Sequence, residues 1–186
     1  MIGYALCGSF CTHKKSLEVL KSILEMGYEV QPIVSETVYS TDTRFGRADE
    51  LIKQLKDMCN REIIHTIVQA EPLGPKIKLD ALIISPCTGN TLAKIANGIT
   101  DTAVTMAAKA HLRGNRPLVL ALASNDALSA NLKNIGTLIS RKSVYFVPME
   151  QDEPIEKPHS LIADFNLLPQ TLADALSGKQ YQKVFK

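Results

Sequence analysis

The segment that most constrains this chain is residues 81–91, where an apolar run meets a cluster of small polar residues. Residues 81–84 read Ala-Leu-Ile-Ile, which is typical of a short buried strand. Ser-Pro-Cys-Thr-Gly-Asn-Thr follows directly, and a helical pattern begins there. The first N–H groups of a helix lack intrahelical acceptors, and the aligned peptide dipoles favour a negative charge beside them. The segment therefore predicts a strand, a ligand-holding loop and a helix in direct succession.

Strand and helix patterns alternate along the rest of the chain as well. We expect strands at residues 3–7, 29–34, 63–68, 81–85, 118–123 and 144–147. Helices are expected between Thr12, as a cap, and Gly27, and then at residues 48–60, 91–96, 103–112, 127–139 (capped by Asp126) and 169–176. Such alternation predicts an α/β fold with a doubly wound parallel sheet in three layers. A length of 186 residues with 45% apolar side chains suits one domain over residues 1–186.

Charge and hydropathy exclude several classes of protein. The net charge is +2, 5% of the residues are aromatic, and no basic run carries interleaved aromatic residues, so we expect no nucleic-acid partner. The longest apolar runs are far shorter than the roughly 20 residues that a membrane span requires. The first residues resemble a strand and lack the zones of a signal peptide. These features favour a soluble, cytoplasmic protein.

The four cysteines do not form a metal-binding or disulfide pattern. Without a secretion signal, disulfides between Cys7, Cys11, Cys59 and Cys87 are not expected. Cys7 and Cys11 lie near His13, but no second pair of ligands has the spacing of a zinc site, so we predict no metal. Cys7 and Cys87 each stand near the end of a predicted strand, where a small apolar residue packs well beside a ligand.

Polar loops follow four of the predicted strands. They are Gly8-Ser9-Phe10, Ser35-Glu36-Thr37, Pro86-Cys87-Thr88-Gly89-Asn90-Thr91 and Ser124-Asn125-Asp126. Ligands of parallel sheets bind beyond the carboxyl ends of the strands, at a switch point in the strand order. We therefore expect these loops to form one pocket rather than four unrelated turns.

The chemistry of this pocket favours a mononucleotide. Hydroxyls, amides and backbone N–H groups with few charges suit a phosphate carried by a larger organic ligand. Neither a GxGxxG segment after the first strand nor a GxxxxGK[ST] segment is present, which disfavours a dinucleotide and a nucleoside triphosphate. FMN fits better, since it has one phosphate and a flat ring that needs an apolar slot.

The residues of the third loop resemble a known family. The segment Pro86-Cys87-Thr88-Gly89-Asn90-Thr91, followed by Lys94, Ala96, Gly98 and Asp101, is similar to the PASANT-type motif of the homo-oligomeric flavin-containing Cys decarboxylases. Gly8-Ser9-Phe10 and Ser35 are similar to the other phosphate-side loops of that family. The resemblance implies a flavodoxin-like fold, trimers or trimer-based assemblies, and FMN near the subunit interface.

Further segments resemble one branch of this family, the flavoprotein subunits that serve dipicolinic acid synthesis in spore-forming bacteria. They are residues 88–94, 97–101, 124–126, 151–154 and 157–158. The resemblance implies an oxidoreductase that converts a dihydrodipicolinate-level intermediate of the lysine pathway into dipicolinic acid, in the cytoplasm of the mother cell. It further implies a partner, the A subunit of the same enzyme, which is similar to dinucleotide-binding proteins and is here called the companion subunit. Whether the flavin or the dinucleotide of the companion subunit takes up the hydride stays open.

Carried over by position, the resemblance assigns roles to the loop residues. The phosphate and ribityl groups of FMN would be held by Gly8, Ser9, Phe10, Ser35, Thr88, Asn90 and Thr91, with Pro86 and Cys87 in the same loop. Ser124 would close the pocket near the ring, and Asn125 would contact the reacting ring as the catalytic candidate.

The chain also departs from the decarboxylases. Residues 75–79 read Pro-Lys-Ile-Lys-Leu where those enzymes use a histidine, and residues 123–126 keep only the asparagine of their PAMN-type loop. Cysteine decarboxylation is therefore not expected. Flavin prenyltransferases share the Pro86-Cys87 and Thr91-Leu92-Ala93 pattern, although their arginine-rich loop is not visible at residues 122–126. A prenyltransferase-like enzyme and a non-catalytic protein that stabilises the companion subunit remain the alternatives.

Proton transfer and substrate binding have several candidate residues. Acid–base chemistry near neutral pH would use a histidine, of which the chain has His13, His65, His111 and His159. A dianionic pyridine dicarboxylate requires cations. The candidates near the predicted pocket are Lys76, Lys109, Arg113 and Arg116.

Overall fold

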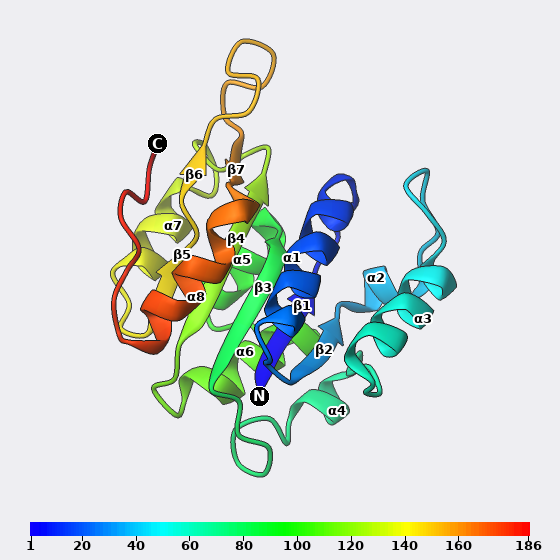
Figure 1. Ribbon diagram of the computed structural model, residues 1–186. Helices are drawn as coiled ribbons and strands as arrows, with labels where there is room; N and C mark the ends of the chain where they lie inside the picture. The colour runs from blue at the N-terminus through cyan, green and yellow to red at the C-terminus, as the bar shows by residue number, and fades with distance from the viewer.

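A twisted sheet lies between two layers of helices in the computed structural model, which describes Met1–Lys186 (Figure 1). Its strands are β1 (Ile2–Leu6), β2 (Val30–Val34), β3 (Ala81–Cys87), β4 (Leu118–Ser124), β5 (Val144–Phe146), β6 (Met149–Glu150) and β7 (Leu161–Ala163). The helices are α1 (His13–Glu25), α2 (Glu36–Ser40), α3 (Ala48–Cys59), α4 (Ile67–Ala70), α5 (Gly89–Ala96), α6 (Ala103–Leu112), α7 (Leu132–Ile139) and α8 (Leu168–Leu176), with 3-10 turns η1 (Phe10–Thr12) and η2 (Phe165–Leu167). No helix is long and apolar enough to cross a lipid bilayer.

The strand order confirms the predicted fold class. Strands β2, β1, β3, β4 and β5 are parallel neighbours in that order, which is the doubly wound order of flavodoxin-like proteins. Two short antiparallel strands extend the sheet, because β7 pairs with the last residues of β4 and β6 pairs with β7. The carboxyl ends of the central strands therefore share one edge of the sheet, which we call the carboxyl edge.

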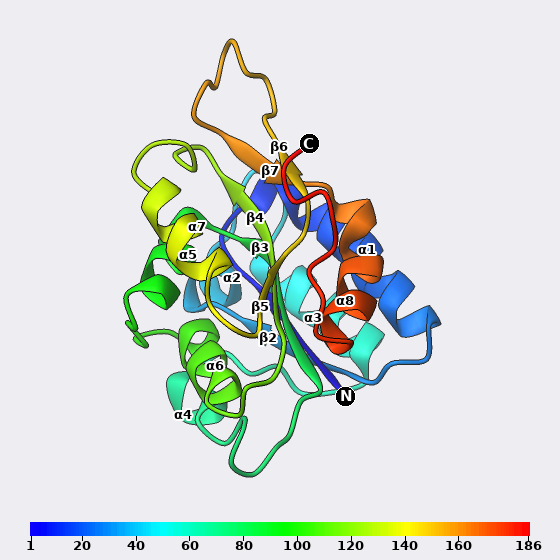
Figure 2. The ribbon, with the colours of Figure 1, turned by 90° about the vertical axis from the view of Figure 1, so that its left-hand side faces the viewer.

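Alternate side chains of the buried strands point into two apolar cores, one on each face of the sheet. Helices α4, α5, α6 and α7 cover one face of the sheet and α1, α3 and α8 cover the other (Figure 2). Leu82 and Ile84 of β3 belong to the first core, whereas Ile83 between them belongs to the second. The buried Tyr4 donates its hydroxyl hydrogen to the Ser16 carbonyl oxygen at 2.7 Å, which ties β1 to α1. Burial raises the pKa of Tyr4 to about 12.

The prediction of a strand at residues 63–68 was wrong. Only Ile64 makes a parallel bridge, to Ile33 at the edge of the sheet. Thr66 and Gln69 then form a capping box in which the Thr66 hydroxyl accepts the Gln69 N–H and the Gln69 side chain accepts the Thr66 N–H. The chain therefore turns into α4 at Ile67. His65 lies outside any strand and stacks on Tyr39, with ring centroids 3.6 Å apart.

One predicted helix start and one predicted capping role also differ from the structure. Helix α7 begins at Leu132 rather than at residue 127, because the Asp126 carboxylate accepts hydrogen bonds from Ser124 and Asn131 instead of capping a helix. Thr12 precedes α1 as expected, but its hydroxyl donates to the Ser9 carbonyl oxygen at 2.8 Å and caps nothing.

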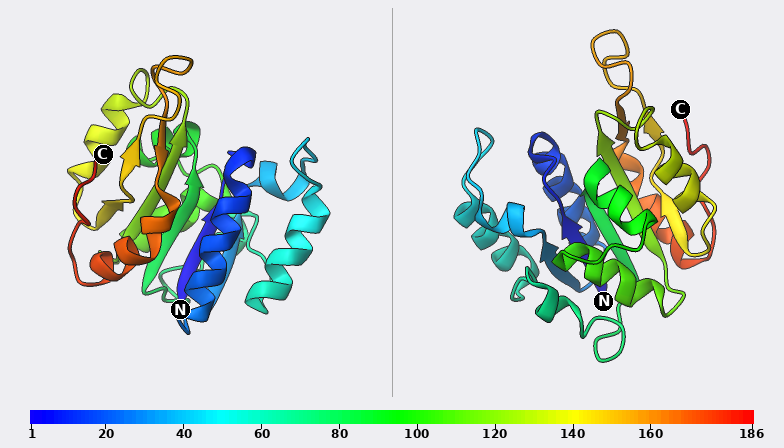
Figure 3. Two further views of the ribbon diagram at one scale, coloured as in Figure 1. Left: turned by 45° about the horizontal axis from the view of Figure 1, so that its top comes forward. Right: turned by 180° about the vertical axis from the view of Figure 1, so that it is seen from behind.

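The sequence analysis did not predict helix α2 or the short strands β6 and β7. Helix α2 starts at the Ser35 hydroxyl, which accepts the Val38 N–H at 3.3 Å. Strands β6 and β7 frame residues 151–160, which project from the carboxyl edge as an arm (Figures 1 and 3). The exposed loop predicted at 151–160 is therefore present, but as the tip of a hairpin.

Candidate functional site

The four polar loops meet at the carboxyl edge, as the sequence predicts. The Thr91 hydroxyl donates to the Cys7 thiol at 3.3 Å, which joins the loops after β3 and β1. A Cβ on Gly8 would lie 4.0 Å from a Thr37 methyl, so the loops after β1 and β2 are in contact. A Cβ on Gly89 would lie 2.5 Å from the Ser124 hydroxyl, which places the loops after β3 and β4 together. One continuous polar surface results.

The turn between β3 and α5 has the geometry of an anion-binding helix start. Thr88 is the N-cap of α5, and its hydroxyl accepts the Thr91 N–H at 3.2 Å. The N–H groups of Gly89 and Asn90 stand in the first turn of the helix, where no intrahelical acceptor exists. Asn90 is exposed, whereas the side chains of Pro86 and Cys87 are buried beneath the loop. This turn can therefore hold a phosphate through backbone donors and hydroxyls.

The loop after β1 supplies half-buried groups and a buried imidazole. Gly8, Ser9 and Phe10 are partly exposed, while His13 at the start of α1 is 8% exposed. Burial lowers the pKa of His13, so the ring is neutral at pH 7. Its Nε2–H donates to the Cys7 carbonyl oxygen at 2.7 Å. This hydrogen bond fixes the first turn of α1 beneath the loop.

The loop after β2 contributes the carboxylate of Glu36, for which the sequence analysis predicted no specific role. Ser35 caps α2 with its hydroxyl, and Glu36 follows in the first turn. A Glu36 carboxylate oxygen accepts the Ala103 N–H at 3.3 Å, which ties α2 to the start of α6. An acidic residue directly after a serine cap was the sequence signal for this helix start.

The loop after β4 is held by a polar network. The Ser124 hydroxyl and the Asn131 amide, the latter at 2.9 Å, both donate to the Asp126 carboxylate. These hydrogen bonds hold the pKa of Asp126 below its usual range, and the one from Ser124 contributes most. Asn125 is exposed, and its side-chain oxygen lies 3.5 Å from the Ser160 hydroxyl at the base of the arm, which donates its hydrogen to the Asp152 carboxylate at 2.5 Å. The catalytic candidate therefore lies where the arm joins the carboxyl edge.

The expected cationic partners lie elsewhere. Arg116 precedes β4 and donates to the Leu79 carbonyl oxygen at 3.1 Å, at the amino-terminal edge of the sheet. His111 lies in the last turn of α6 at the same edge, where its Nε2–H donates to the Pro117 carbonyl oxygen at 2.8 Å. Lys76, Lys109 and Arg113 belong to the adjoining loop and last turn of α6. The expectation that these cations flank the carboxyl-edge pocket was therefore wrong.

No three His, Cys, Asp or Glu side chains lie close enough together to hold a metal ion. Cys11 is exposed, whereas Cys7 and Cys87 are buried. Burial raises the pKa of Cys7 to about 11 and also raises that of Cys87. Both buried thiols are therefore protonated packing groups under the loops.

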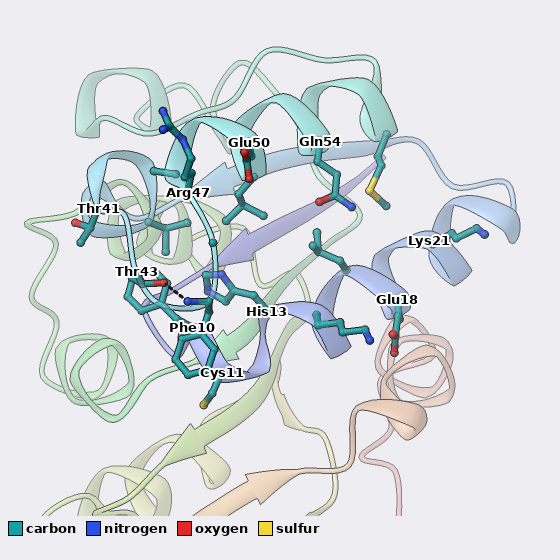
Figure 4. Close-up of a pocket in the computed structure, with 18 of the residues that line it drawn as sticks. Phe10, Cys11, His13, Glu18, Lys21, Thr41, Thr43, Arg47, Glu50 and Gln54 are labelled. Atoms are coloured by element: carbon teal, nitrogen blue, oxygen red, sulfur yellow. Dashed lines mark hydrogen bonds between the residues drawn. The ribbon is translucent and has the colours of Figure 1, made fainter.

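A large cavity adjoins this edge but does not coincide with it. It is a groove of about 1010 Å³ between α1 and α3, here called the α1–α3 groove (Figure 4). Phe10 lines it at one end and also belongs to the loop after β1. The sequence reasoning missed this groove, because no motif marks the space between two helices.

Comparison with known proteins agrees with this architecture. The profile of the family described as Flavoprotein matches residues 1–168. The B subunit of dipicolinate synthase from Bacillus subtilis (strain 168) is 46% identical over 183 residues, which cover 98% of this chain and 92% of that protein.

Solved structures show the same relationship. The crystal structure of the B subunit of dipicolinate synthase from Bacillus halodurans C superposes with a TM-score of 0.92 at 44% identity, covering 100% of this chain and 95% of that one. AnUbiX (PadA1), solved with FMN and dimethylallyl pyrophosphate, has a TM-score of 0.63 at 21% identity over 79% of this chain and 76% of its own, and shares the fold. From the family profile and the 46% identity along nearly its whole length, the chain belongs to the flavoprotein family.

Proposed function

We propose that the chain is the flavoprotein subunit of a dipicolinate synthase and that it binds FMN at the carboxyl edge. The observation that carries this proposal is the 46% identity to the B subunit of a dipicolinate synthase over 98% of the chain. The meeting of four polar loops at one edge supports it independently, because that is where doubly wound sheets bind ligands.

The residues at this edge fit a flavin mononucleotide. The N–H groups of Gly89 and Asn90 and the hydroxyls of Ser9, Ser35 and Thr88 would hold the phosphate and ribityl groups. The backbone of Gly8, Pro86 and Cys87 and the side chains of Phe10 and Thr91 would shape the slot. Ser124 would close it near the ring. A bound flavin supplies a two-electron acceptor for oxidation of a dihydropyridine.

The chain's own contribution to the reaction is positioning. Asn125 is exposed at the carboxyl edge, and its amide stays uncharged across the pH range. It can donate and accept hydrogen bonds, so it would orient the dicarboxylate substrate rather than remove its proton. This role requires the companion subunit, with which the chain would work in the cytoplasm of a sporulating cell. We expect a trimer-based homo-oligomer around the flavin site.

Titration of the purified chain with FMN, followed by flavin fluorescence and absorbance, tests the cofactor. The Thr88→Ala/Asn90→Ala variant should lose saturable binding. Thr66→Ala/Asn166→Ala is the matched control, since Thr66 caps α4 as Thr88 caps α5 and neither control residue lies in the four loops. The control should bind FMN as the unmodified chain does.

Dipicolinate formation by a mixture of this chain with the companion subunit tests the reaction. The mixture should form the product, and Asn125→Ala should slow its formation while leaving FMN binding intact. The proposed function would be contradicted if this chain bound no FMN and the companion subunit formed dipicolinate equally fast with and without it.

A further inference from the structure

We propose that Ser160 and Asp152, at the base of the arm, turn the Asn125 amide so that its oxygen faces the substrate and accepts a hydrogen bond from it. This inference rests on the proposed function, because it concerns the substrate contact assigned there. Ser160 and Asp152 are positioning residues, since they act on the substrate only through Asn125. The arm carries them at the carboxyl edge, beside the end of β4 (Figures 1 and 3).

The pairing of β4 with β7 brings Ser160 to Asn125. Ser124, the last residue of β4, pairs in antiparallel register with Leu161, the first residue of β7. Asn125 and Ser160 are the next residues beyond this pair, one on each segment, so the register places them beside each other. Ser160 is 2% exposed. Its hydroxyl must therefore find its hydrogen-bond partners within the protein.

Asp152 sets the direction of the Ser160 hydroxyl. The Ser160 Oγ lies 2.5 Å from an Asp152 carboxylate oxygen and 3.5 Å from the Asn125 side-chain oxygen. A hydroxyl has one hydrogen and a carboxylate only accepts, so the hydrogen belongs to the shorter, charge-assisted bond with Asp152. Ser160 therefore faces Asn125 with a lone pair and can only accept a hydrogen bond from it.

One orientation of the Asn125 amide suits this lone pair. Two oxygens with no hydrogen between them repel each other, whereas the amide NH2 is a donor. An amide that turns by about 180° exchanges its oxygen and nitrogen within nearly the same shape. The NH2 then donates to Ser160, and the oxygen lies on the other side of the amide. Asn125 is exposed and its side chain has no further hydrogen-bond partner in the chain, so this oxygen is free for a ligand.

A free amide oxygen favours a ligand that carries a donor hydrogen. A partly reduced ring offers an N–H in its enamine form or an O–H in its hydrated form. The dianion of pyridine-2,6-dicarboxylate, which is the product, has a ring nitrogen and carboxylate oxygens that only accept. In the site, the product would set a lone pair against the Asn125 oxygen. Ser160 and Asp152 therefore make the site bind the substrate in preference to its product.

Calorimetric titration of the FMN-loaded chain, in complex with the companion subunit, measures this preference. Two planar probes carry the same pair of carboxylates. Pyridine-2,6-dicarboxylate has no donor hydrogen at neutral pH, whereas 4-hydroxypyridine-2,6-dicarboxylate carries one in each of its tautomers. The unmodified chain should bind the second probe about fivefold to tenfold more tightly, as expected for one hydrogen bond.

Two variants and a matched control separate this role from general damage to the arm. Asp152→Ala frees the Ser160 hydrogen for the Asn125 oxygen and turns the NH2 to the ligand, so the preference should reverse toward pyridine-2,6-dicarboxylate. Ser160→Ala removes the partner of the amide and should abolish the preference. Glu153→Ala should keep it, because Glu153 also pairs with Lys157, at 2.9 Å, but has no hydrogen bond to Ser160. Loss of arm structure alone would not reverse a preference.

The outcomes separate this inference from the proposed function. A donor preference that is absent from the unmodified chain, or that persists in Asp152→Ala or Ser160→Ala, would overturn the positioning role. If the same complex forms dipicolinate, the proposed function stands without it. A complex that binds FMN but neither probe would also overturn the positioning role, because Asn125 would then not contact the dicarboxylate ring. A chain that binds no FMN and neither probe, and forms no dipicolinate with the companion subunit, would overturn both.

Discussion

Replacing Gly89 by alanine should destabilise the protein although it removes a glycine from a helix. Gly89 is the first residue of α5 and is buried against the loop after β4. An added Cβ would lie 2.5 Å from the Ser124 hydroxyl, 2.6 Å from the Asn131 amide nitrogen and 2.8 Å from an Asp126 carboxylate oxygen. Non-bonded atoms do not approach so closely, so at least one of these groups must move.

The magnitude follows from two opposing contributions. Alanine gains about 0.5–1 kcal/mol over glycine within a helix. Displacing the Ser124 or Asn131 donor removes a hydrogen bond to the charged Asp126, which costs about 1.5–3 kcal/mol. The net loss in the free energy of unfolding is about 0.5–2.5 kcal/mol. For a chain of this length, that loss lowers the melting temperature by about 1–10 °C.

Gly136 provides the matched control. It lies within α7, and an added Cβ would meet nothing within 4 Å. Gly136→Ala should therefore raise the free energy of unfolding by about 0.5–1 kcal/mol. Thermal and urea unfolding of both variants measure these changes. A Gly89→Ala protein as stable as Gly136→Ala would refute the close packing of α5 against the Asp126 network.

Two further measurements use other side chains. Burial lowers the pKa of His111 to about 4, whereas its value in the unfolded chain is about 6.5. Between pH 6.5 and pH 4 the unfolded chain therefore binds a proton at His111 that the folded chain does not bind. The free energy of unfolding falls by up to about 3 kcal/mol as the pH is lowered through this range. His111→Gln should flatten the urea-unfolding profile over that pH range whereas the exposed His159→Gln should not, and equal slopes in all three proteins would contradict the assignment. Because Cys11 is exposed, a thiol reagent at neutral pH should label one cysteine per native chain, and Cys11→Ser should abolish this labelling. Rapid labelling of a second thiol would contradict the burial of the other three cysteines. The protected thiols are Cys7, Cys59 and Cys87.

The fold was predictable where the hydrophobic pattern was long and where one strand faced two helical layers. Residues 81–84 and 118–123 are apolar without interruption, and both became central parallel strands. Residues 63–68 also read as a strand, but Thr66 and Gln69 form a capping box that starts a helix. Local capping therefore prevailed over β propensity, and the Thr-x-x-Gln spacing was the signal that would have revealed it.

The candidate site was predictable only to the level of its loops. Parallel topology places the residues after β1, β2, β3 and β4 at one edge, so their meeting followed from strand order. The hydrogen-bond partners of the side chains in these loops could not be predicted from strand order. Asp126 was expected to cap a helix but accepts hydrogen bonds from Ser124 and Asn131, one on each side of it in the sequence. Such choices depend on how α5 and α7 pack, which no local pattern encodes.

The contact of Gly89 with the loop after β4 has a consequence for how such chains diverge. The first turn of α5 and the side chains of Ser124, Asp126 and Asn131 occupy one shared space. A larger residue at position 89 is tolerated only if smaller or differently bonded residues appear at the other three. We therefore expect these positions to vary together among homologues, so that the two loops evolve as a single unit even though more than thirty residues separate them in the sequence.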